Sequence, residues 1–272
     1  MERTITSEIV VGYSQCPRKA YLLLCTKERG TQHEYIQILE KQQQIAQRNY
    51  IEDLRQENTD VQPYSLDNLN GNHKYLVNIT LEVDVYSAKC AVLTKVRTHS
   101  VFGHYSYEPT IVVGAHTIKK EHRLELFFVG YVLGRVQEKR PSFGYIVGLD
   151  GKSHRVKLEN GSKTLTPFLE SLQEWFAEED PEPPSLILNK NCPACQFRNL
   201  CREKAVQEDN LSLLDGISTQ KAINKYEKKG LFTVKQLSYT FKPRKRKKRA
   251  KNPPPTIHKP ELQALAVCRR AT

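Results

Sequence analysis

Four of the seven cysteines in this chain have a spacing that suits metal binding. Cys192 and Cys195 are separated by two residues, and Cys201 follows after five more, in the segment CPACQFRNLC. A CxxC pair can bind one metal centre from a single turn, and Cys16 can supply a fourth thiolate if the fold brings the chain's ends together. The wide split of the ligands favours an iron–sulfur centre, while a structural zinc stays open because four thiolates suit both.

A run of positive charge near the C-terminus is the second feature with chemical meaning. The segment KPRKRKKRAK, residues 242–251, holds eight Lys and Arg and no acidic residue, in a chain whose net charge is +12. Such a run is typical of a protein that binds nucleic acid, and the alternative is a solvated tail or a targeting signal. The candidate phosphate contacts are Lys242, Arg244, Lys245, Arg246, Lys247, Lys248 and Arg249.

The segment before this run, residues 211–239, resembles a helix–hairpin–helix module. Two short helices are expected on either side of a turn at Gly216 and Ile217, and a second glycine precedes the start of a further helix. In that family the turn presents backbone N–H groups to a DNA phosphate without reading sequence. The chain departs from the motif at Ser218, where a second glycine is usual, so a plain helical pair is the alternative reading.

Composition restricts the class of protein. The chain has 272 residues, enough for a sizeable core. An odd number of cysteines without an N-terminal leader argues against a disulfide scaffold and favours a reducing, cytoplasmic compartment. No stretch approaches eighteen apolar residues, so we expect no membrane partner.

Hydrophobic periodicity predicts an α/β fold on a mixed sheet. Alternation of apolar and polar residues is clearest over 75–86, and Asp150-Gly151 predicts a hairpin turn. Ser7 is the predicted N-cap of the first helix. The predicted helices are 7–25, 31–57, 119–138, 166–177 and 261–270, and the predicted strands are 75–86, 89–96, 105–113, 145–149 and 154–158.

The N-terminal CPRKAYLL, the distant CPACQFRNLC and the strands between them resemble the RecB-like PD-(D/E)xK nucleases that carry an iron–sulfur cluster. The likeness extends over about residues 1 to 240 and is greatest to members in which a helix–hairpin–helix segment follows the nuclease domain. It implies a restriction-endonuclease-like core closed by one [4Fe–4S] cluster on Cys16, Cys192, Cys195 and Cys201. The domains implied are a nuclease domain at 1–208, a helix–hairpin–helix-like module at 209–240, and a basic linker with a helical stub at 241–272.

The resemblance also implies a metal-dependent active site. Such nucleases hold Mg²⁺ or Mn²⁺ with carboxylates, and Asp84 and Glu108 fit these roles, with His33 as an additional ligand. The motif reads Glu108-Pro109-Thr110, so the lysine of the (D/E)-x-K pattern is missing. The lysines that remain candidates to assist catalysis are Lys95, Lys119 and Lys120.

Two functions follow from these residues. The first is a metal-dependent nuclease that cuts single-stranded or duplex DNA, with a structural cluster. The alternative is a DNA-binding protein with a catalytically degenerate nuclease fold, or an N-terminal fragment of a longer nuclease. The missing lysine favours the alternative.

Overall fold

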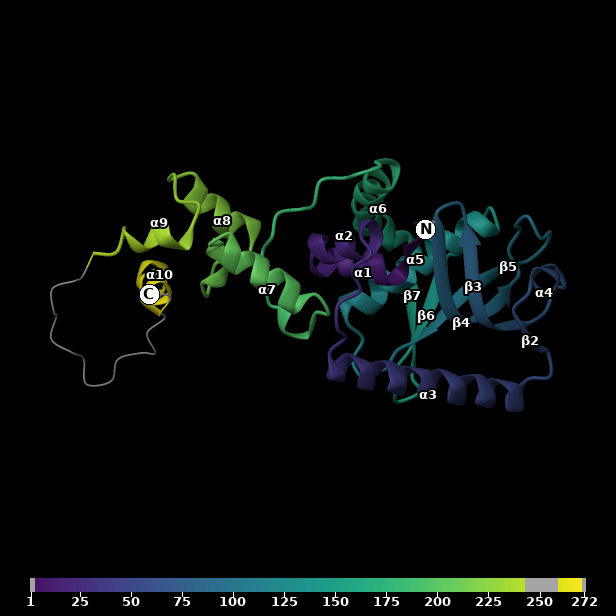
Figure 1. Ribbon diagram of the computed structural model, residues 1–272. Helices are drawn as coiled ribbons and strands as arrows, with labels where there is room; N and C mark the ends of the chain where they lie inside the picture. The colour runs from purple at the N-terminus through teal and green to yellow at the C-terminus, as the bar shows by residue number, and fades with distance from the viewer. Residues whose placement is uncertain (1–2, 243–258, 271–272) are drawn as a thin grey trace. The chain divides into compact units, whose positions relative to one another are not determined.

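The computed structural model describes residues 3–242 and 259–270, and the chain divides into two compact units. Unit 1 extends from Met1 to Pro184 and unit 2 from Ser185 to Thr272 (Figure 1). This division differs from the expected boundary at residue 208, because the cysteine-rich segment belongs to unit 2 and not to the α/β domain. In the described part of the chain, no helix has both the length and the apolar character to cross a membrane.

Unit 1 is built on a mixed, seven-stranded sheet, which confirms the predicted α/β class. Strands β2 to β7 lie side by side in chain order, and β1 pairs in parallel with β4. The antiparallel pairs are β3–β4, β4–β5 and β6–β7, and the parallel pairs are β2–β3 and β5–β6. The strands are β1 Ile5–Thr6, β2 Val61–Pro63, β3 Tyr75–Val83, β4 Tyr86–Val96, β5 Ser106–Val112, β6 Phe143–Val147 and β7 Ser153–Lys157.

Helices cover both faces of this sheet. The larger core lies where α1, α2, α5 and α6 pack on one face, around fully buried residues such as Leu126 and Phe128. The smaller core lies between the other face and α3, whose Ile51 belongs to one cluster with Val77 and Val112. The helices of unit 1 are α1 Ser7–Gln15, α2 Pro17–Cys25, α3 Glu34–Glu57, α4 Leu66–Asn70, α5 Lys120–Val136 and α6 Ser162–Ala177, with a 3-10 turn, η1 Leu158–Gly161.

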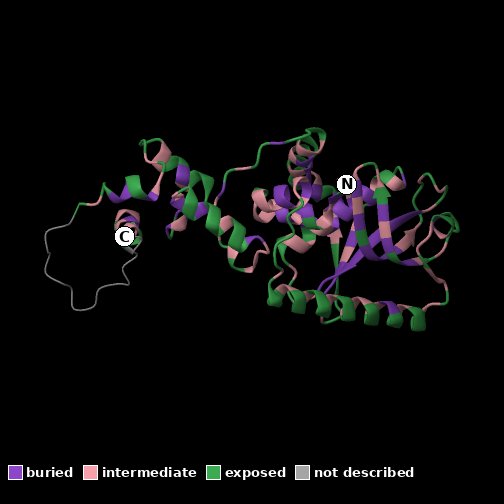
Figure 2. Cartoon of the chain, viewed as in Figure 1, coloured by how far each residue is buried: buried purple, intermediate pink, exposed green. Residues whose placement is uncertain are grey.

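Helix α3 is the least buried of the long helices. Ile51 is its single buried residue, and Figure 2 shows the helix exposed along most of its length. Because an amphipathic helix is held mainly by its apolar face, the N-terminal half of α3 must depend on polar contacts to the sheet.

The helix predicted over 7–25 is instead two helices, α1 and α2, with a break at Cys16. The backbone of Cys16 is extended (φ −165°, ψ 111°), because a residue that precedes proline, here Pro17, is disfavoured in the helical region. The N-cap of α1 is Thr6, which accepts a hydrogen bond from the N–H of Ile9, and not the predicted Ser7.

Unit 2 is helical. A 3-10 turn, η2 Cys192–Ala194, precedes α7 Arg198–Gln207 and a second 3-10 turn, η3 Leu211–Leu213; α8 Gln220–Glu227, α9 Val234–Ser238 and α10 Pro260–Arg270 follow. A small core joins the last three helices through Ile223, Val234, Leu237 and Ala264. The predicted Gly-Ile turn is therefore flanked by a 3-10 turn and by α8 and not by two α-helices.

Candidate functional site

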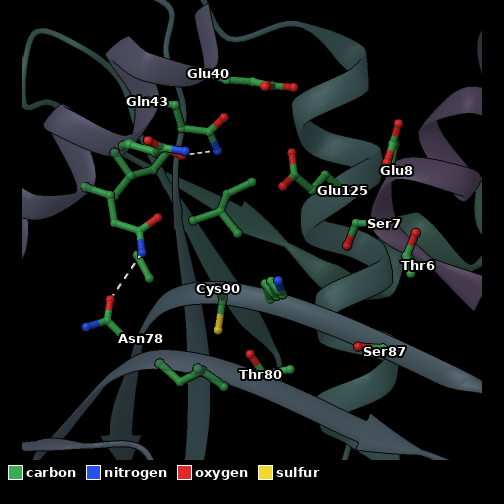
Figure 3. A pocket seen from close by; sticks show the side chains of 17 residues that line it. Thr6, Ser7, Glu8, Glu40, Gln43, Asn78, Thr80, Ser87, Cys90 and Glu125 are labelled. Atoms are coloured by element: carbon green, nitrogen blue, oxygen red, sulfur yellow. Dashed lines mark hydrogen bonds between the residues drawn. The ribbon is translucent and has the colours of Figure 1, made fainter. Parts of the chain in front are cut away.

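A cavity of about 700 Å³, lined by polar and apolar residues, lies in unit 1 between α1, α3, α5 and the strands β3 to β5. Its volume is within the range of ligand-binding pockets. Glu8 of α1, Glu40 of α3 and Glu125 of α5 line it together with Lys89 of β4, as Figure 3 shows for the three carboxylates. The cavity therefore gathers three acidic groups and one basic group in a protein whose overall charge is positive.

Glu125 is the most unusual group in this cavity. It lies on α5 between the buried Leu124 and Leu126, and it lines the cavity together with the buried Cys90. Burial raises the pKa of Glu125 from its ordinary value of 4.5 to about 7. Burial also raises the pKa of the Cys90 thiol, with a smaller contribution from the charge of Glu125, so Cys90 is unsuited to act as a nucleophile.

The wall formed by α3 is a row of amides held by hydrogen bonds. Gln43, Gln44 and Gln47 share one helical face with Glu40, as their spacing requires. Gln43 Nε2 donates to the carbonyl oxygen of Val112 (2.9 Å), and Gln47 Nε2 donates to Asn78 Oδ1 (3.3 Å; Figure 3). These bonds hold the N-terminal half of α3 over the cavity where apolar contacts are few.

Two local irregularities also lie at the cavity. Asn78 has a left-handed backbone (φ 56°) in the middle of β3, a conformation that asparagine tolerates better than most residues. The hydroxyl oxygen of Ser7 is buried. Among the buried side-chain polar atoms of the described residues, it alone has no hydrogen-bond partner. Both residues line the cavity.

The structure does not bring the two predicted catalytic carboxylates together. Asp84 lies in the two-residue turn between β3 and β4, whereas Glu108 pairs with Thr94 near the opposite end of β4. From Tyr86, which follows the turn, to Thr94 is eight residues of extended strand, so roughly 25 Å separates the two sites. The expectation that Asp84 and Glu108 share one metal ion is therefore wrong.

Each of these carboxylates has a structural partner instead. Asp84 Oδ2 lies 2.7 Å from a guanidinium nitrogen of Arg135, in an exposed ion pair. Glu108 is buried on the central strand β5, and its Oε1 accepts a hydrogen bond from the N–H of Phe143 (3.3 Å). Burial raises the pKa of Glu108, and the Phe143 bond and the charge of Arg155 partly oppose this.

The other predicted catalytic groups are also placed apart from the cavity. His33 is the N-cap of α3, where its Nδ1 accepts a hydrogen bond from the N–H of Tyr35 (3.1 Å). Lys95 Nζ donates to the carbonyl oxygen of Asn72 (2.8 Å), and Lys119 and Lys120 form the start of α5. None of the 17 described residues that line the cavity is a predicted catalytic or metal-binding residue.

Sequence reasoning missed Glu8, Glu40, Glu125 and Lys89, which come from three helices and one strand. The signal that was present is Glu125, a single carboxylate inside the apolar run Leu124 to Val129. A charged residue among positions that a helix buries is expected to face a cavity or a partner.

The cysteine segment of unit 2 has features of a thiolate metal site, but its side chains do not converge on one point. Cys192 and Cys195 bracket the turn η2, Cys201 lies in the first turn of α7, and the N–H of Asn189 donates to Cys192 Sγ (3.2 Å). Hydrogen bonds from backbone N–H groups to sulfur are typical of cluster ligands. In residues 3–242 and 259–270, no three His, Cys, Asp or Glu side chains converge closely enough to hold a metal ion. The donor chemistry fits a metal centre, whereas the side chains as they stand do not form one.

Helix α8 carries the clearest basic surface of unit 2. Lys221, Lys225 and Lys228 follow one another at spacings of four and three residues, so they share one face, and with Thr219 they line a shallow groove. The opposite face is held by Ile223 in the core. Packing of Ile223 therefore leaves the three lysines on the exposed side of the helix.

In the predicted phosphate-binding turn, Gly216 is accessible to a ligand but Ile217 is not. Gly216 is exposed with a left-handed backbone (φ 86°), and no atom lies within 4 Å of the place where a side chain would begin. The side chain of Ile217 is buried and its N–H donates to the carbonyl oxygen of Leu214 (3.2 Å), so Ile217 does not offer a free amide. Lys242 is exposed, while Arg244 to Arg249 lie outside the described residues.

Comparison with known proteins does not assign the chain to a family. The chain matched none of the protein-family models against which it was scanned, and a search of curated proteins returned no significant match.

Proposed function

We propose that this chain binds nucleic acid, and DNA in particular, through contacts of α8 with the phosphate backbone. The observation that carries the proposal is the groove in which Lys221, Lys225 and Lys228 lie together with the hydroxyl of Thr219. Residues 185–242 hold ten Lys and Arg against five Asp and Glu, so the surrounding surface is positive as well.

The chemistry of this surface predicts the mode of binding. Lysine ammonium groups neutralise phosphates and release counterions, but they carry no sequence information. Gly216, which lies beside the start of α8 in the chain, leaves room for a phosphate to approach the backbone. Binding is therefore expected to be independent of sequence and strongly dependent on salt, and the run from Lys242 to Lys251 adds to it.

The test is a titration of labelled single-stranded and duplex DNA at several salt concentrations. The variant K221Q/K225Q/K228Q should weaken binding and flatten the slope of log K against log salt by about 2.7 for duplex, since each lost phosphate contact removes about 0.9. The matched control is K27Q/K41Q/K163Q, which removes the same charge from exposed sites on unit 1. Equal loss in both variants would show that net charge, and not α8, determines binding.

A second candidate function, metal-dependent cleavage of DNA, is favoured by the cavity of unit 1. Glu8, Glu40, Glu125 and Lys89 are the residue types that such chemistry needs, and they line one cavity. Mg²⁺ is usually bound by one or two carboxylates and completed by water and substrate phosphates, so full convergence of the protein ligands is not required. A bound Mg²⁺ or Mn²⁺ would neutralise the phosphate charge that develops in hydrolysis.

This second function is tested by cleavage of labelled DNA in the presence of Mn²⁺. The variants E125Q and E40Q should abolish cleavage, whereas D84N, which changes an exposed ion pair, should leave it unchanged. If the protein binds DNA but does not cut it, or if all three variants cut alike, unit 1 is not a nuclease and the binding function stands alone.

We further propose that Cys192, Cys195 and Cys201, with Cys16 as the fourth ligand, hold a [4Fe–4S] cluster, or else a structural zinc ion. The CxxC turn and the N–H bond to Cys192 support this proposal. Thiolate centres persist in a reducing compartment, which is consistent with a cytoplasmic protein. Metal analysis of anaerobically purified protein separates the alternatives, since iron and a broad band near 400 nm identify the cluster. Loss of the metal in C195S, but not in C25S, is the expected result.

A further inference from the structure

The loop between β4 and β5 holds two exposed histidines side by side. His104 Nδ1 lies 3.3 Å from His99 Nε2, and the two rings are nearly perpendicular, with centroids 4.6 Å apart. Neither histidine lines the cavity of unit 1 or belongs to the cysteine segment. The pair is therefore a separate chemical feature of the molecule.

The loop is held in place by several hydrogen bonds. Ser100 and Gly103 exchange backbone hydrogen bonds of 3.1 and 3.0 Å, and the Ser100 hydroxyl accepts a bond from the N–H of Phe102 (3.1 Å). The N–H of Val101 donates to the carbonyl oxygen of Gln137 (3.1 Å), which ties the loop to the end of α5. Gly103 has φ 103°, which side chains rarely permit. The two histidines are thus presented by a preorganised turn.

The distance between the two nitrogens suits two states of the pair. Without a metal ion, the 3.3 Å contact is a hydrogen bond in which one imidazole N–H donates to the other ring. Two imidazole nitrogens bound to one tetrahedral ion at about 2.0–2.1 Å are also separated by about 3.3 Å. The two rings are therefore already spaced as two ligands of one ion would be, and an ion would replace the shared proton.

We propose that His99 and His104 chelate a divalent transition-metal ion of the zinc class through Nε2 and Nδ1, respectively. Imidazole nitrogens select zinc, nickel or copper over magnesium and calcium, which prefer oxygen ligands. In the described part of the chain no third His, Cys, Asp or Glu completes the site, so water would have to supply the remaining ligands. The proposal does not depend on nucleic-acid binding, on nuclease activity or on the cysteine centre.

The test follows the histidine nitrogens directly, because cysteines elsewhere in the chain also bind zinc. In a long-range ¹H–¹⁵N spectrum of the full chain titrated with Zn²⁺, His99 Nε2 and His104 Nδ1 should shift together with a single saturation point. The resonances of His116 and His154 serve as internal references, and Mg²⁺ should shift none of them. Independent titration of His99 and His104, or shifts at the other two nitrogens of the pair, would overturn the proposal.

Variants complete the experiment. H99A should weaken the response of His104 to Zn²⁺ by at least tenfold, because chelation needs both rings, and H99Q repeats the test with a side chain of closer size. H154A, on the exposed edge strand β7, is the matched control and should leave both responses unchanged. An unaltered His104 response in H99A or H99Q contradicts the proposal.

Discussion

The carboxyl of Glu125, a partly buried residue of the cavity, makes the stability of unit 1 depend on pH in a direction opposite to that of a paired carboxylate. Its pKa is about 7 in the folded chain and near its ordinary value of 4.5 when unfolded. Below pH 4.5 the group is protonated in both states and contributes nothing. Between pH 4.5 and 7 the unfolded state loses its proton first, so the free energy of unfolding falls, and above pH 7 the full penalty is present.

At pH 8 the raised pKa of Glu125 lowers the free energy of unfolding by about 3 kcal/mol, since each pKa unit corresponds to about 1.36 kcal/mol. E125Q, which keeps the shape and removes the charge, should therefore raise the free energy of unfolding at pH 8 by up to this amount and have little effect at pH 4. The same substitution at an exposed position, E170Q on α6, is the control and should have no pH-dependent effect.

The assay is urea unfolding followed by the fluorescence of Trp175, in buffer with EDTA. Trp175 is the single tryptophan of the chain and packs against Tyr13 and Tyr21, so its signal reports on unit 1. A gain in E125Q that is equal at pH 4 and pH 8, or a loss at pH 8, would refute the assignment of a destabilising buried charge to this residue.

Three further predictions use the same fluorescence assay. In G114A the new methyl would lie 2.5 Å from the backbone oxygen of Leu39, so α3 must move and stability should fall by about 1–3 kcal/mol; an unchanged midpoint would show that α3 adapts freely. R3A removes hydrogen bonds from the Arg3 guanidinium to backbone carbonyls at the C-terminal end of α6, so the free energy of unfolding should fall by about 1–2 kcal/mol. R3K should recover little of this loss, because lysine lacks the planar guanidinium. Equal stability of R3A and the parent protein would contradict this prediction. The N–H of Lys74 donates to Asp60, and this bond with other contacts lowers the pKa of Asp60. D60N weakens the bond and should lower the free energy of unfolding by about 1 kcal/mol at pH 7, a loss that should shrink as pH falls below 3.8. A loss that stays constant down to about pH 3 would exclude this origin.

The elements that could be predicted from sequence are those fixed by local pattern. The apolar run over 75–86 locates β3, although both faces of this strand are buried, with Leu76 in the larger core and Val77 in the smaller one. Asp150-Gly151 locates the β6–β7 hairpin, where Gly151 has φ 73°. The site could not be predicted in the same way. Glu8, Glu40 and Glu125 are distant in sequence and line one cavity only because α1, α3 and α5 pack around the same strands.

The wrong expectation for Asp84 and Glu108 has a definite physical origin. The alternation that marks polar residues on β3 continues through Asp84, but the strand ends at Val83 and Asp84 turns away with φ 51°. Glu108 looks polar in sequence, yet every residue of β5 is buried, because β5 lies between β4 and β6 in the sheet. Strand position in the sheet, which is a tertiary property, decides the role of each carboxylate.

The cavity of unit 1 is the place where this domain departs most from the rules that stabilise a fold. The unpartnered hydroxyl of Ser7, the left-handed backbone of Asn78 and the buried carboxyl of Glu125 come from three different elements, and each lowers stability. Their convergence at one cavity is expected of a site kept for ligand binding, since destabilising features collect where function requires them.

A cation that enters this cavity would offset the destabilisation caused by the Glu125 carboxylate. If Mn²⁺ binds the folded state, the free energy of unfolding of unit 1 should rise by about 1.4 kcal/mol when the ion is tenfold above its dissociation constant. The rise should be much smaller in E125Q and should persist in D84N, because Asp84 pairs with Arg135 away from the cavity. Equal stabilisation of all three proteins by Mn²⁺ would mean that the ion binds elsewhere and that Glu125 does not hold it.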